Sequence, residues 1–272
     1  MIEILRKFSG RGACDGYPLS KNRFLESLLV EMVSENYRQL VSEALIRSGE
    51  TRKMGLLRLD PPLRGNERVA SSLVQAALSR MTIRSRTEGR VERELANGRV
   101  DHLAWYANHV IGVEFKVARM ALRLAKTGRV EESHDGNEKV LVRVDGPWKE
   151  VVEQSESALR TLEQLKQQDS KLYPRPISLP LLLVVGQRRV KRAALDVMED
   201  SLEEYRQAFI DALPSDRVDY LAVYTAPKEH RVACERAHGK ADRDTEGVMY
   251  VPCYAFLSGK TGDGGHWMIP ER

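Results

Sequence analysis

Two carboxylates and a lysine stand at a spacing that could build a cation site. Twelve residues separate Asp101 from Glu114, which fits one strand, a tight turn and the return strand. Lys116 follows Glu114 by two positions, so both side chains point to the same face of a strand. A hairpin of this length sets Asp101 beside them. Such a group is suited to holding a divalent metal ion and a water molecule.

The residues around Glu114 strengthen this interpretation. The segment Val110–Val117 is apolar apart from Glu114 and Lys116, which is typical of a buried strand. A buried charge is costly unless it is paired or bound to a metal ion. The alternative is a solvated hairpin face, on which alternating charges are common. His102, beside Asp101, should point to the opposite face of the strand.

A helix and a β-meander are expected to position these side chains. Apolar residues recur at helical spacing through Asn66–Met81, and Asn66 can cap that helix. Three β segments follow at Thr82–Glu94, Arg99–Tyr106 and Val110–Val117, with a turn at residues 107–109. The acidic residues would lie on the middle and last strands.

The rest of the chain predicts a mixed β-sheet flanked by helices, an α/β fold. Pro61-Pro62 suggests a hinge, which divides the chain into an N-terminal helical segment, 1–60, and a second domain, 61–272. Residues 131–138 read as a polar loop and 139–144 as a short strand. Further helices are expected at 20–47, 147–168 and 193–213, and further strands at 179–185, 218–224 and 247–257.

Composition sets broad limits on the function. The 272 residues carry a net charge of +4, with 42% hydrophobic and 30% charged residues. No apolar run approaches the roughly 20 residues of a membrane span, and no signal peptide is seen. Three widely spaced cysteines predict free thiols and a cytoplasmic protein. Four basic residues follow Lys116: Arg119, Arg123, Lys126 and Arg129. Their spacing indicates one face of a helix, which either binds nucleic acid or is simply solvated.

Asp101, followed by Glu114-Phe115-Lys116, resembles the motif of the PD-(D/E)xK nuclease superfamily, which has the restriction-endonuclease-like fold. The resemblance covers about residues 66–224 and includes an acidic residue, Glu67, on the preceding helix. It departs from the family pattern at Val100, where a proline is usual. The motif is short, but the order of Glu67, Asp101 and Glu114-Phe115-Lys116 along the chain supports the resemblance.

The resemblance implies a set of roles for these residues. Asp101, Glu114 and the backbone carbonyl of Phe115 would bind Mg²⁺, with Mn²⁺ as a substitute, through hard oxygen ligands. Lys116 would hold the attacking water and stabilise developing negative charge. Glu67 would be a further metal ligand or only a carboxylate favoured at a helix start. Gln154 would be a polar residue of the site or a solvent-facing glutamine.

The expected activity is therefore a Mg²⁺-dependent endonuclease that hydrolyses DNA phosphodiester bonds, in restriction, phage defence or repair. DNA is the expected partner, and no association with a membrane is expected. A homodimer is compatible with cutting both strands. Two alternatives remain. One is a catalytically inactive nucleic-acid-binding or assembly protein on the same fold, and the other is a nuclease that acts on RNA or on single strands.

Overall fold

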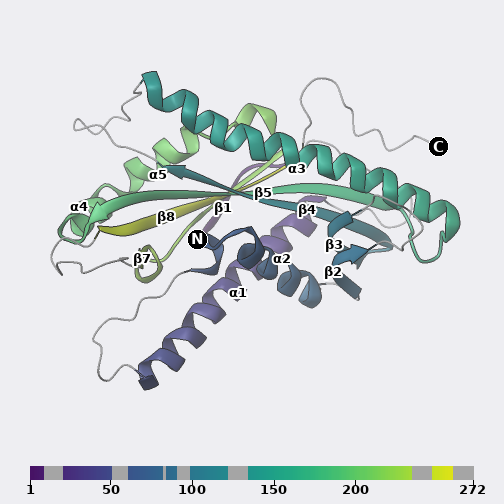
Figure 1. The fold of residues 1–272 in the computed structure, drawn as a ribbon, viewed down its shortest axis with the longest axis horizontal. Coiled ribbons are helices and arrows are strands. Elements are labelled where there is room, and N and C mark those ends of the chain that lie inside the picture. The colour runs from purple at the N-terminus through teal and green to yellow at the C-terminus, as the bar shows by residue number, and fades with distance from the viewer. Residues whose placement is uncertain are drawn as a thin grey trace.

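Helices cover both faces of one mixed β-sheet (Figure 1). The computed structural model describes residues 1–8, 21–50, 61–81, 84–90, 99–121, 134–234 and 247–259. Within these ranges the sheet has eight strands, and this arrangement confirms the predicted α/β architecture. The strands are β1 (Ile2–Arg6), β2 (Arg84–Arg90), β3 (Arg99–Tyr106), β4 (His109–Ala121), β5 (Pro176–Lys191), β6 (Tyr220–Thr225), β7 (Val232–Cys234) and β8 (Gly247–Ser258).

The strand order is β1-β6-β8-β5-β4-β3-β2, and β7 pairs with β8. Strands β2, β3 and β4 form the predicted antiparallel meander. Ala107 and Asn108 form its tight turn with φ values of 47° and 60°, as a two-residue hairpin turn requires. Strands β4 and β5 are parallel, so the chain needs a long crossover between them, and α3 provides it.

The helices form two layers. In Figure 1, α3 and α5 lie above the sheet, α1 and α2 lie below it, and α4 lies at its left-hand end. No helix in the described ranges has the length and apolar character that crossing a membrane requires. The helices are α1 (Lys21–Glu50), α2 (Glu67–Met81), α3 (His134–Gln168), α4 (Leu195–Asp200) and α5 (Leu202–Asp211), with short 3₁₀ turns at Pro62–Arg64, Arg192–Ala194, Ser215–Arg217 and Lys228–His230.

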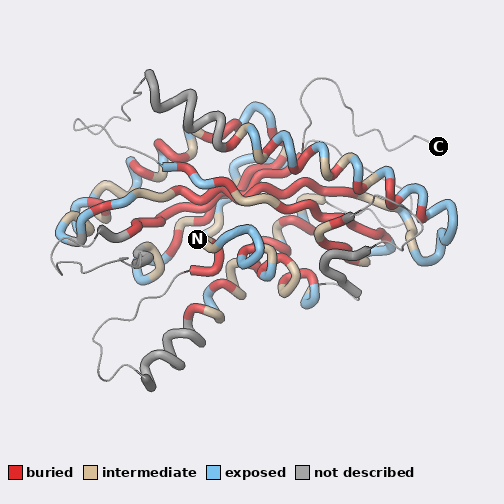
Figure 2. The backbone as a smooth tube through the Cα atoms, viewed as in Figure 1, coloured by how far each residue is buried: buried red, intermediate tan, exposed pale blue. Residues whose placement is uncertain are grey.

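The strands carry the core, as the buried positions in the middle layer of Figure 2 show. On the lower face, Phe115 of β4 belongs to the same buried cluster as Leu28 of α1 and Leu73 of α2. On the upper face, Gly112 of β4 lets α3 approach closely. A Cβ at that position would lie 3.2 Å from a methyl carbon of Leu162. The strand that carries Glu114 is therefore packed on both sides.

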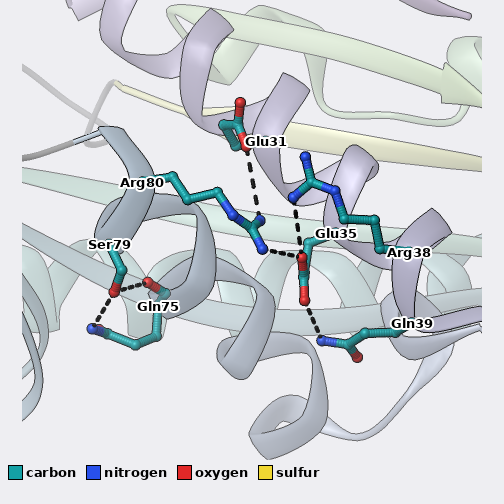
Figure 3. Close-up of polar contacts among 7 residues, drawn as sticks. All are labelled: Glu31, Glu35, Arg38, Gln39, Gln75, Ser79 and Arg80. Atoms are coloured by element: carbon teal, nitrogen blue, oxygen red, sulfur yellow. Dashed lines mark hydrogen bonds and ion pairs between the residues drawn. The ribbon is translucent and has the colours of Figure 1, made fainter. Parts of the chain in front are cut away.

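A polar network joins α1 to the end of α2 (Figure 3). The Arg80 guanidinium donates to the Glu35 carboxylate at 2.6 Å, and Gln39 donates to the same group at 3.0 Å. Burial alone would raise the pKa of Glu35, but the hydrogen bonds from Gln39 and Arg80 lower it. The charged carboxylate is therefore the favoured form, and it ties the two helices of the lower layer together.

The described parts of residues 1–60 pack with the rest of the fold. Strand β1 pairs with β6 at one edge of the sheet, and α1 contributes to the lower core. The expected hinge at Pro61-Pro62 is buried, and the side-chain oxygen of Asn36 accepts a hydrogen bond from the Leu63 N–H at 3.0 Å. This bond fixes the connection into α2. Described residues on the two sides of the boundary proposed at residue 60 are therefore in contact.

Three expectations about the upper layer are wrong. Helix α3 begins at His134 and passes through Pro147, so residues 134–138 are not loop and 139–144 are not a strand. Val144 and Trp148 are buried in the same cluster on either side of the proline, and their packing offsets the hydrogen bond that the proline removes. The helix expected at 193–213 is interrupted at Ser201, which separates α4 from α5.

Candidate functional site

Asp101 and Glu114 face each other across β3 and β4. The backbone pairing between these strands extends as far as His102 and Val113. At the next position, hydrogen bonds from the backbone to side-chain carboxylates take its place. One carboxylate oxygen of Asp101 accepts a hydrogen bond from the Phe115 N–H at 3.0 Å. The Asp101 N–H lies 3.4 Å from a carboxylate oxygen of Glu114. The two acidic groups thus meet where the hairpin opens.

Glu114 is in an unfavourable place for a lone negative charge. Its side chain is 3% exposed, while Asp101 is half-buried. Burial and the nearby charge of Asp101 raise the pKa of Glu114 to about 8, although the charge of Lys116 opposes the rise. At neutral pH the metal-free protein therefore keeps a proton on Glu114, and a bound cation would take the place of that proton.

Lys116 makes its ion pairs with two other carboxylates. Its ammonium nitrogen lies 3.3 Å from Oε1 of Glu67, at the start of α2, and 3.0 Å from Oε1 of Glu150, on α3. Burial alone would lower the pKa of Lys116, but the two carboxylates raise it. The lysine is therefore held in its charged form beside the acidic pair.

Gln154 reaches Lys116 only through Glu150. The amide nitrogen of Gln154 donates to Oε1 of Glu150 at 3.2 Å, one helical turn away. Glu150 was not among the residues expected from the sequence. Glu150 lies four residues before Gln154 on an expected helix, and this spacing is the only sign in the sequence that the two side chains are neighbours. The packing of α3 on the sheet then places Glu150 beside Lys116.

Arg119 lies on β4, not on the helix that its spacing predicts. Its guanidinium donates to the backbone carbonyls of Arg64 and Gly65 at 3.2 and 3.1 Å, just before α2. Asn66 then caps α2 by accepting from the Val69 N–H at 3.0 Å, as expected. These bonds fix the position of Glu67. The remaining members of the basic run, Arg123, Lys126 and Arg129, lie outside the described residues.

His102 points away from the acidic pair, as strand alternation predicts. Its Nε2 lies 2.9 Å from the Ser71 hydroxyl of α2, on the lower face of the sheet. Burial lowers the pKa of His102 to about 4, although Asp101 opposes the shift. The imidazole is therefore neutral at physiological pH and serves the packing between β3 and α2.

The donors available for a metal ion are few. In the ranges that the structure describes, no three or more His, Cys, Asp or Glu side chains converge to hold a metal ion. A strand residue directs its N–H and its carbonyl toward the same neighbour, so the Phe115 carbonyl also faces the Asp101 side. Asp101, Glu114 and this carbonyl are hard oxygen donors of the kind that Mg²⁺ accepts, with water completing its shell.

Comparisons with known proteins do not add to this site. Neither a protein-family model, nor a curated protein, nor a solved structure gave a significant match to the chain.

Proposed function

We propose that this protein is a metal-dependent nuclease of the restriction-endonuclease-like fold that hydrolyses phosphodiester bonds in DNA. The observation that carries the proposal is the adjacent carboxyl groups of Asp101 and the buried Glu114, with a charged lysine two positions after Glu114 on the same strand. A divalent cation would neutralise this pair and supply Lewis-acid activation of the scissile phosphate. The ligand set would be Asp101, Glu114, the Phe115 carbonyl and, as a further member, Glu67.

The chain's own residues have distinct tasks in this proposal. Asp101 and Glu114 lie on neighbouring strands of a packed sheet, so their separation is set before substrate binds. Lys116 presents a positive charge next to them, where it can orient a water molecule and stabilise negative charge on phosphate oxygens. Such fixed charges assist most where the surroundings are dry, and the nearly complete burial of Glu114 provides that condition.

One observation favours the inactive alternative. The Lys116 ammonium is already paired with Glu67 and Glu150, so a substrate phosphate would compete with two carboxylates for it. A protein that binds nucleic acid through this fold without cleaving it would tolerate that arrangement. Cleavage assays distinguish the two functions directly, and RNA and single-stranded DNA substrates belong in the same assays.

The test uses supercoiled plasmid with Mg²⁺ or Mn²⁺. We expect nicking or linearisation by the wild-type protein, none with EDTA, and a loss on the order of 100-fold or more for Asp101→Asn and Lys116→Ala. Lys149→Ala is the matched control, because Lys149 is an exposed lysine of α3 that pairs with Glu153. Equal cleavage by all four proteins would contradict the proposed site. Sedimentation of the protein with and without DNA reports whether it acts as a homodimer.

A further inference from the structure

Two helices on opposite faces of the sheet converge on Lys116. Glu67 comes from α2 below the sheet and Glu150 from α3 above it (Figure 1), and each places Oε1 within 3.3 Å of the lysine nitrogen. Lys116 is largely covered, with 18% of its side chain exposed, whereas the two glutamates are about half exposed at 47% and 55%. The ammonium group is thus bracketed from both sides.

Glu150 is itself held in place. The same oxygen that contacts Lys116 accepts a hydrogen bond from Gln154. Next to it along α3, Val151 is fully buried and Trp148 nearly so, in the upper core. The helix therefore cannot rotate about its axis without disturbing that core, and Glu150 stays directed at the lysine.

We propose that Glu150 is a positioning residue, which sets the place of the Lys116 ammonium, and that Gln154 orients Glu150. This inference rests on the proposed function. A lysine side chain is a point charge on a flexible four-carbon stem, so its direction must come from its partners. Glu67 is also the carboxylate that a metal ion would recruit. Glu150 then remains as the partner that keeps Lys116 beside the acidic pair.

Because Glu67 and Glu150 are about half exposed, removing Glu150 should affect the position of Lys116 far more than the stability of the protein. Ion pairs of exposed carboxylates contribute only about 0–1 kcal/mol to folding. We therefore expect Glu150→Ala to leave the melting temperature of the protein nearly unchanged while it releases the lysine. Glu153→Ala is the matched control, because it removes an exposed carboxylate from the next turn of the same helix, where the partner is Lys149.

The first measurement does not depend on catalysis. In ¹H–¹⁵N spectra of the lysine ammonium groups, assigned with Lys116→Arg, we expect a distinct Lys116 signal in the wild type and in Glu153→Ala. It should shift or broaden in Glu150→Ala and change less in Gln154→Ala. An unchanged signal in Glu150→Ala would overturn the positioning role, whether or not the protein cleaves DNA.

The second measurement uses cleavage kinetics at fixed pH and saturating Mg²⁺. We expect Glu150→Ala to lower kcat about 10-fold with little change in KM for DNA, and Glu150→Gln, which keeps an acceptor oxygen, to recover part of the loss. An equal loss in Glu153→Ala, or an effect on KM alone, would overturn the proposal. If the wild type does not cleave at all, the proposed function fails, and the ammonium spectra still decide whether Glu150 positions Lys116.

Discussion

The Asp101 carboxylate accepts a hydrogen bond from the Phe115 N–H across the two strands, at 3.0 Å. A backbone carbonyl of β3 would occupy this position in a regular antiparallel ladder. The side chain thus replaces the ladder where the hairpin opens, and its negative charge is fixed next to the buried Glu114. The acidic pair is therefore built into the pairing of the sheet, and its charge has consequences for stability as well as for binding.

Glu114 should make stability depend on pH in the metal-free protein. Its pKa is raised from 4.5 to about 8 in the folded state, so the folded protein holds a proton that the unfolded chain has lost. The free energy of unfolding should therefore fall as pH rises from about 4.5 to 8, by a few kcal/mol at most. Urea unfolding at pH 5, 7 and 9 in EDTA measures this fall.

Glu114→Gln should remove this dependence, because the amide does not ionise and is nearly the same size. We expect the variant to be more stable than the wild type at pH 9 and about equally stable at pH 5. Glu153→Gln, at an exposed position on α3, should behave as the wild type does. The same change in stability between pH 7 and 9 in Glu114→Gln and in the wild type would show that Glu114 is not held near Asp101 as described.

Divalent cations should stabilise the folded protein and should compete with the Glu114 proton. A ligand present at 100 times its dissociation constant adds about 2.7 kcal/mol to the free energy of unfolding. We expect Mg²⁺ or Mn²⁺ to raise the melting temperature, more at pH 9 than at pH 6.5, and EDTA to reverse the effect. Asp101→Asn should abolish the increase. If the melting temperature of Asp101→Asn still rises with Mg²⁺ or Mn²⁺, the cation binds elsewhere.

Local patterns in the sequence predict much of the fold around the acidic pair. The start of α2 at Asn66, the tight turn at residues 107–108 and both strands of the hairpin follow from capping, turn chemistry and alternation. These features depend on residues close together in the chain. The side-by-side placement of Asp101 and Glu114 is of this kind, since a single hairpin produces it.

Contacts between distant segments are what the sequence does not reveal. Glu150 meets Lys116 only because α3 crosses back over the sheet, and β1 joins the sheet only by pairing with β6, more than 200 residues later. Arg119 has helical spacing from the next basic residues, yet the β4 ladder with β5 continues through it. Pairing with a buried neighbouring strand overrides a weak local pattern there.

Arg119 should act on the start of α2 and not on DNA. Arg119→Lys keeps the charge but loses the guanidinium nitrogen, Nη2, that donates to both carbonyls before Asn66. We expect a stability loss of about 1 kcal/mol, since the residue is exposed, and lower cleavage through a displaced Glu67. The salt dependence of DNA binding should not change, as it would if a phosphate contact were lost. Arg160→Lys, on the exposed face of α3, is the control.

His102 should make the protein sensitive to acid. Burial lowers its pKa to about 4 in the folded state, against 6.5 in the unfolded chain, so the unfolded chain takes up the proton first as pH falls. The contribution of His102 to the free energy of unfolding should therefore be fully retained above pH 6.5 and should drop by about 3 kcal/mol between pH 6.5 and 4. His102→Gln can keep a hydrogen bond to Ser71 without titrating, so its stability should fall less over this range. The comparison of the two slopes in urea unfolding isolates His102, because other acid-sensitive groups are common to both proteins. Identical slopes would mean that His102 is not buried against α2.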